Sequence, residues 1–171
     1  MAQKKEVYKE KFKHTGYWTY KEVYDMLFHW FHEHQYKIQE DLYNEKIISS
    51  GKEVIIKWKG EKKVTDYFKY QIQADWHILH MKDVEVEVDG KKVKTQNGEV
   101  EIIFKGNLIK DYEKRWEDKP FWKFLRGVYE KYVIRETVDE FEDHVEDDVR
   151  EMIGELKAFL KLEAPIILER P

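Results

Sequence analysis

FKYQIQADWHI, residues 68–78, is the stretch that decides the fold class of this chain. Apolar residues occupy every second position, and polar residues occupy the positions between them. A strand with this alternation has one face buried and one face in water, as in an antiparallel sheet. Shorter runs of the same period cover residues 54–58, 84–88 and 100–108. The sequence therefore predicts an antiparallel β-meander of about five or six strands.

Turn residues separate these runs. Ser49-Ser50-Gly51 precedes the first of them, and Asp89-Gly90 and Asn97-Gly98 divide the later ones. Asp-Gly and Asn-Gly favour the two-residue turns that join neighbouring antiparallel strands, because these residues adopt positive φ readily. We therefore expect a hairpin at each of the two dipeptides.

An N-terminal helix is predicted over residues 19–34. Its apolar side chains recur three and four positions apart, as on the buried face of an amphipathic helix. Thr19 and Glu22 have the spacing of a capping box, in which the two side chains satisfy free backbone N–H groups at the helix start. A short strand at residues 9–14 is expected before this helix.

A long helical pattern closes the chain. It opens at Pro120, where proline suits the first turn of a helix, and breaks near residues 135–137. Beyond the break one face is apolar as far as Phe159, and Pro165 is expected to end the helix. The predicted fold class is therefore α+β, an antiparallel meander packed by an N-terminal helix and a long, kinked C-terminal helix.

Length and composition narrow the class of protein. The chain fits a single domain, residues 1–171, with 1–8 and 164–171 predicted as loosely ordered tails. Charged residues make up 39% and aromatic residues 15%, a balance that argues against disorder. Cysteine is absent, which excludes disulfides, thiolate metal sites and thiol nucleophiles.

Charge and targeting signals bear on location and partners. The net charge of −4 predicts no overall attraction to nucleic acid or to an anionic membrane. Neither a signal peptide nor a membrane-spanning run is recognisable, so a cytoplasmic location is expected. The abundance of Lys and Glu favours a thermophilic source. No cofactor is expected.

Two segments resemble a known group of sequences. DYFKY at residues 66–70 and PFWKFLRG at residues 120–127 look like a group of uncharacterised small archaeal proteins. The resemblance runs over most of the chain, from Glu10 to Glu163, and implies no activity. The element order also resembles the helix-grip, START-like arrangement, although fold alone does not imply function.

Histidine is the first candidate for chemistry. Asp25, His29 and His32 fall on the polar face of the predicted first helix, where they are candidate zinc ligands. The alternative is an ordinary solvated helix face, which the sequence favours because surface histidines far outnumber metal ligands. No metal site is therefore predicted.

A second histidine pair lies on the longest strand. His77 and His80 are three residues apart, so they point to opposite faces unless the strand contains a bulge. Asp75 and His77 share a face and are candidates for a carboxylate-oriented imidazole, against the alternative of an ordinary polar sheet face. The only serines, 49 and 50, lie in a turn distant in sequence from these histidines, so a serine nucleophile is not expected.

The leading functional hypothesis is a non-enzymatic binding or assembly module that forms homo-oligomers or binds another protein. It rests on large apolar residues outside the predicted core faces, which are typical of interfaces. The candidate interface residues are Trp30, Trp116 and Trp122.

Two alternatives remain open. The first is a carrier of an apolar small molecule, held between the sheet and the long helix. Its candidate ligand-binding residues are Tyr70, Ile72, Trp76, Phe104, Tyr129 and Phe141. The second is single-stranded nucleic-acid binding on a basic and aromatic strand face, which the acidic net charge disfavours. Its candidate residues are Lys57, Lys59, Lys69 and Gln71 with Tyr43 and Tyr67.

Overall fold

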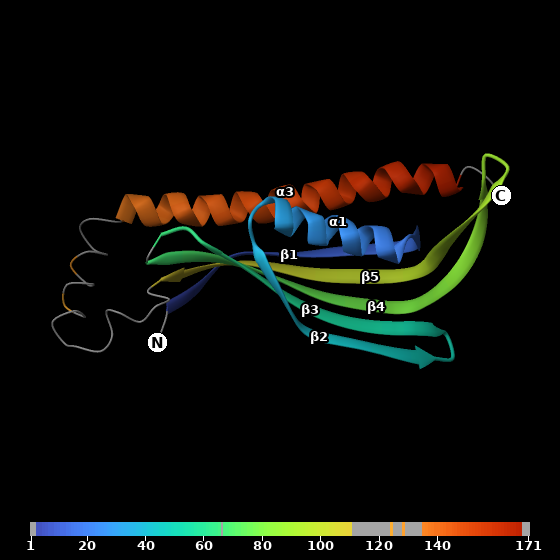
Figure 1. Ribbon diagram of the computed structural model, residues 1–171, viewed down its shortest axis with the longest axis horizontal. Helices are drawn as coiled ribbons and strands as arrows, with labels where there is room; N and C mark the ends of the chain where they lie inside the picture. The colour runs from blue at the N-terminus through green and yellow to red at the C-terminus, as the bar shows by residue number, and fades with distance from the viewer. Residues whose placement is uncertain (1–2, 66, 111–123, 125–127, 129–134, 169–171) are drawn as a thin grey trace.

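The structure is a computed structural model that describes residues 3–65, 67–110, 124, 128 and 135–168, with side chains in the last segment at 138–161. In this part of the chain five strands form one antiparallel sheet in the order β1-β5-β4-β3-β2, and helices α1 and α3 lie on the same face of it (Figure 1). The elements are β1 (Gln3–Trp18), α1 (Tyr20–Glu33), β2 (Lys37–Ile48), β3 (Gly51–Lys63), β4 (Phe68–Val88), β5 (Lys91–Lys110) and α3 (Arg135–Leu168). The α+β class and the antiparallel meander are confirmed.

The two longest strands differ from the prediction at Asn97-Gly98. This dipeptide lies within β5, so the hairpin expected there is wrong. The opposing strand β4 has a register shift between Leu79 and Lys82. Gly98 lies so close to β4 that a Cβ atom on it would stand 2.8 Å from Cα of Met81. Glycine is therefore required here by close strand approach and not by a turn.

The turn at Asp89-Gly90 is confirmed. Asp89 has φ 52° and Gly90 has φ 78°, the positive values expected of a two-residue hairpin turn. This turn joins β4 to β5, and the two strands curl upward together at the end of the sheet near the C-terminal end of α3 (Figure 1).

Both predicted chain ends need correction. Gln3 pairs with Lys110 in the sheet, so residues 3–8 belong to β1 and are not a loose tail. Helix α3 continues past Pro165 to Leu168. A proline removes one N–H donor and does not forbid helical geometry in the residues after it. The helix predicted from Pro120 lies almost wholly outside the described residues.

The start of α1 is held by the sheet and not by a capping box. The backbone N–H of Tyr20 donates to Oε1 of Gln96 on β5, at 2.8 Å. The Thr19 hydroxyl lies 3.1 Å from the hydroxyl of Thr95 and makes no capping bond. The side chain of Gln96 thus satisfies a free donor of the helix terminus and ties α1 to β5.

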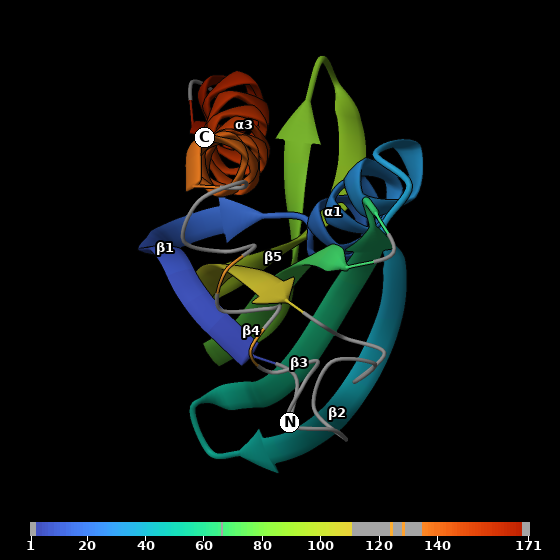
Figure 2. The ribbon, with the colours of Figure 1, turned by 90° about the vertical axis from the view of Figure 1, so that its left-hand side faces the viewer.

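The core lies between the helix-bearing face of the sheet and the two helices. Trp58 of β3 is central to it, with ring centroids 4.8 Å from Tyr24, 5.1 Å from Trp76 and 6.3 Å from Phe31. Viewed end on, α3 and α1 lie side by side above the sheet, with α3 over β1 and α1 toward β2 (Figure 2). None of the helices in the part of the chain that the structure describes is long and apolar enough to cross a membrane.

Candidate functional site

Strand β2 forms an exposed edge of the sheet. It is the last strand in the sheet order, and among the residues that the structure describes it pairs only with β3. Of its residues only Ile38 and Ile48 are partly buried, and the others are exposed. The opposite edge strand, β1, packs against α3. The two edges therefore differ, and β2 is the more open of them.

The second half of β2 combines regular geometry with apolar side chains. Its pairing with β3 is irregular between Glu40 and Leu42 and then continuous from Leu42 to Ile48. Ile47 is 81% exposed, and Leu42 and Tyr43 are also among the exposed large apolar residues. We name the segment Leu42–Ile48 the β2 edge. The β2 edge thus presents three large apolar side chains to solvent.

A row of aromatic rings on α1 borders this edge. Tyr20, Tyr24 and Phe28 are spaced four residues apart, so they lie along one side of the helix. The Tyr20 hydroxyl donates to the Tyr43 hydroxyl at 3.2 Å, which joins the row to β2. Burial, followed by the hydrogen bond with Tyr43, raises the pKa of Tyr20 above its ordinary value. Tyr20 is therefore a neutral hydrogen-bond donor throughout the neutral pH range.

The predicted interface residues do not lie on this surface. Trp30 is only 2% exposed and belongs to the core. Its ring stacks on His34, with centroids 4.0 Å apart, and on Tyr36. The apolar face of α1 is therefore wider than the predicted one, and Trp30 does not supply exposed aromatic surface. Trp116 and Trp122 lie outside the described residues.

The residues predicted to line a ligand cavity are part of the packed core. Tyr70, Ile72, Trp76 and Phe104 are each at least 96% buried. Phe141 of α3 is half-buried and packs on Tyr70, with ring centroids 6.2 Å apart. Tyr129 lies outside the described residues. The four buried side chains belong to the hydrophobic core between the sheet and the helices, and Phe141 packs against that core.

The candidate metal ligands on α1 are only partly brought together. Asp25 and His29 line a groove of about 570 Å³ between α1 and α3, together with Trp30, Glu155 and other residues. His32 is exposed and does not line this groove. Among the residues that the structure describes, no three of His, Asp and Glu are arranged to hold a metal ion.

Asp75 and His77 share the open face of the sheet, as predicted, and line one hollow of about 240 Å³. The imidazole is oriented by a different carboxylate, since Nε2 of His77 lies 3.0 Å from Oε1 of Glu53 on β3. Asp75 is therefore not the partner that the sequence suggested for this histidine.

Sequence reasoning missed a serine–histidine contact. Oγ of Ser50 lies 2.6 Å from Nδ1 of His80, although the two residues are thirty positions apart. The register shift between Leu79 and Lys82 marks a bulge in β4. A bulge at this place is what allows His77 and His80, which are three residues apart, to approach the same face of the sheet. The positive φ of His80, 55°, is consistent with such a bulge.

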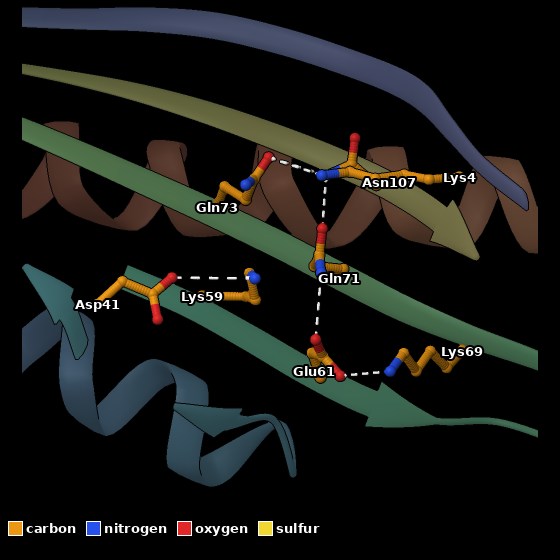
Figure 3. Close-up of polar contacts among 8 residues, drawn as sticks. All are labelled: Lys4, Asp41, Lys59, Glu61, Lys69, Gln71, Gln73 and Asn107. Atoms are coloured by element: carbon orange, nitrogen blue, oxygen red, sulfur yellow. Dashed lines mark hydrogen bonds and ion pairs between the residues drawn. The ribbon is translucent and has the colours of Figure 1, made fainter. Parts of the chain in front are cut away.

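The open face of the sheet holds a chain of side-chain hydrogen bonds (Figure 3). The buried Asn107 donates from Nδ2 to Oε1 of Gln71 at 3.3 Å and to Oε1 of Gln73 at 3.2 Å. Gln71 donates in turn to Oε1 of Glu61 at 3.1 Å, and Lys69 lies 2.5 Å from Oε2 of the same carboxylate. The buried side-chain amides of Asn107 and Gln71 thereby have hydrogen-bond partners.

Two of the lysines that the nucleic-acid hypothesis invokes are ion-paired. Lys69 is paired with Glu61, and Lys59 lies 3.9 Å from Asp41. Tyr43 is bonded to Tyr20 on the helix-bearing side of the sheet, so it does not join Lys59 and Lys69 on the open face. Lys57, a third candidate lysine, is exposed on the open face, so the candidate residues of this hypothesis are divided between the two faces of the sheet.

Glu61 gives a pH-dependent contribution to stability. Burial raises the pKa of Glu61, but hydrogen bonds from Lys69 and Gln71 together with the charges of Lys69 and Lys59 outweigh burial, and the pKa lies below its ordinary value. A carboxylate with a lowered pKa stabilises the fold above its unfolded pKa, and this contribution is lost as the pH falls through the folded pKa.

We predict that Glu61→Gln costs about 1 kcal/mol at neutral pH and that this difference disappears in acid. Urea unfolding of both proteins from pH 7 down to pH 3 measures it. The exposed Glu87 of β4 provides a control, since Glu87→Gln should give a difference that varies little with pH. A constant cost of Glu61→Gln at all pH values would contradict the assignment.

The chain matches no protein-family model, and no curated protein or solved structure is significantly similar to it.

Proposed function

We propose that the protein is an assembly module whose partner is a second copy of the same chain, joined through the β2 edge. The observation that carries this proposal is a regular, exposed outer strand with apolar side chains at Leu42, Tyr43 and Ile47. The unpaired backbone of an edge strand is a template for another strand. Pairing of two such edges would join the two sheets into one and satisfy these groups.

The sequence of the β2 edge is complementary to itself. In an antiparallel pairing centred on Glu45, Tyr43 of one copy faces Ile47 of the other, and Leu42 faces Ile48. Cross-strand pairs of an aromatic and a β-branched residue contribute about 0.2–1 kcal/mol each. The two Glu45 side chains would meet at the centre. In each chain Nζ of Lys52 lies 3.3 Å from Oε1 of that chain's Glu45, which would offset the repulsion between them.

The tyrosine hydroxyls also support this register. Tyr20 donates to Tyr43, and Tyr43 donates to Oε2 of Glu45 at 3.4 Å. The Tyr43 ring is thus fixed before the partner arrives, which lowers the entropy cost of binding.

The test is the mass of the protein in solution, with an edge variant and a matched control. Wild-type protein at tens of micromolar should have twice the 21.0 kDa chain mass by light scattering. Ile47→Lys should raise the dissociation constant at least tenfold, because an edge lysine opposes strand pairing. Val93→Lys adds the same charge at another exposed apolar position, on β5, and should remain dimeric. A monomeric wild type, or an unaffected Ile47→Lys dimer, would reject the proposal.

A further inference from the structure

The bulge in β4 is accommodated by glycines on both neighbouring strands, which approach its backbone closely. A Cβ atom on Gly51 of β3 would stand 2.8 Å from the carbonyl oxygen of Met81, and one on Gly98 of β5 would stand 2.8 Å from Cα of Met81. His80, just before Met81, has φ 55°, which is strained for a residue with a side chain. Bulges of this kind re-aim a side chain, and retained backbone strain is common at functional sites.

We propose that Ser50 and His80 form an acyl-transfer site in which Ser50 is the nucleophile and His80 the general base. Oγ of Ser50 lies 2.6 Å from Nδ1 of His80, within the distance needed for direct proton transfer. Both side chains line a hollow of about 340 Å³ at the junction of β1, β4, β5 and the β2–β3 turn. A hollow of this size suits a small ester.

The other residues of the hollow supply the remaining parts of such a site. Lys82 and Asn97 line it with an ammonium group and an amide, the donor types that stabilise the oxyanion of a tetrahedral intermediate. Glu99 also lines it, and its pKa is held below the ordinary value by the hydrogen bond and charge of Lys13 and by the charges of His80 and His77. An ionised Glu99 favours the positive charge that His80 acquires during the reaction.

The reaction balances without a cofactor. Oγ of Ser50 forms a bond to the ester carbonyl carbon, its proton passes to Nδ1 of His80, and the carbonyl electron pair moves to oxygen. The intermediate collapses, the bond to the alcohol oxygen breaks, and the alcohol leaves with the proton from His80. Water then attacks the acyl-serine with His80 again as base, which releases a carboxylic acid and restores Ser50. The net reaction is ester plus water to acid plus alcohol.

The chain provides its own control, because Ser49 and Ser50 are its only serines. The experiment treats the purified full chain with a fluorophosphonate, which phosphonylates a serine with loss of fluoride, and locates the adduct by peptide mass spectrometry. We expect labelling at Ser50 and not at Ser49. The same protein should hydrolyse p-nitrophenyl acetate, and Ser50→Ala should lose this activity while Ser49→Ala retains it.

The role of His80 is tested with His80→Asn, because asparagine tolerates positive φ and should preserve the bulge. Circular dichroism verifies its fold. Loss of a general base should slow labelling of Ser50 by about 100-fold or more. Absence of labelling, equal labelling of both serines, or an unchanged rate in His80→Asn would overturn the proposal.

Discussion

Trp58→Ala is expected to lower the free energy of unfolding by about 3–5 kcal/mol. Trp58 is 2% exposed and lies where α1 meets the sheet. Its ring contacts Tyr24, Phe28 and Phe31 from α1 and Trp76 from β4. Truncation to alanine removes all of these contacts and leaves a cavity that neighbouring strands cannot close. Urea unfolding followed by circular dichroism measures the loss.

The matched variant is Trp58→Phe, which retains one aromatic ring at the same place. We expect it to cost roughly half as much as alanine, because a smaller cavity forms and ring contacts remain. It also removes the 3.4 Å hydrogen bond from Nε1 of Trp58 to Oε1 of Glu40 on β2. A loss below about 1 kcal/mol in Trp58→Ala would show that α1 does not depend on this ring.

The fold class was predictable because it depends on local periodicity. Alternation over residues 68–78 identified β4, and helical spacing over 19–34 identified α1 within one residue of its observed bounds. The bulge in β4 was not predictable in the same way. It depends on Gly51 and Gly98, which lie on either side of Met81 and are thirty and seventeen positions from it in the sequence.

The candidate sites depended on contacts of the same long-range kind. Ser50 meets His80 only because the β2–β3 turn lies beside the bulge. The exposure of Ile47 depends on strand order, since β2 is an edge strand that has a neighbour on one side only among the described residues. The sequence pattern places Trp30 outside the core because the predicted apolar stripe of α1 is narrower than the face that packs. The order of the strands in the sheet, and the face of a helix that packs on it, cannot be obtained directly from a single sequence.

Gly98→Ala is expected to cost about 3 kcal/mol or more, although Asn97-Gly98 is not a turn. The new Cβ would stand 2.8 Å from Cα of Met81, 3.1 Å from its backbone nitrogen and 3.1 Å from the carbonyl oxygen of Leu79. All three atoms belong to the backbone of a paired strand, so relief requires β4 and β5 to separate. Thermal and urea unfolding measure the cost.

Gly90 provides the contrast, because it is a turn glycine with φ of 78° at which an added Cβ atom would meet nothing within 4 Å. Gly90→Ala should cost about 1 kcal/mol from backbone strain alone, and Gly90→Asn should cost less because asparagine tolerates this conformation. Gly98→Asn should gain nothing over Gly98→Ala, since its penalty is steric and not conformational. If asparagine rescued position 98 as it does position 90, the Asn97-Gly98 dipeptide would be a turn after all, and the continuous β5 strand and the bulge opposite it would both be wrong.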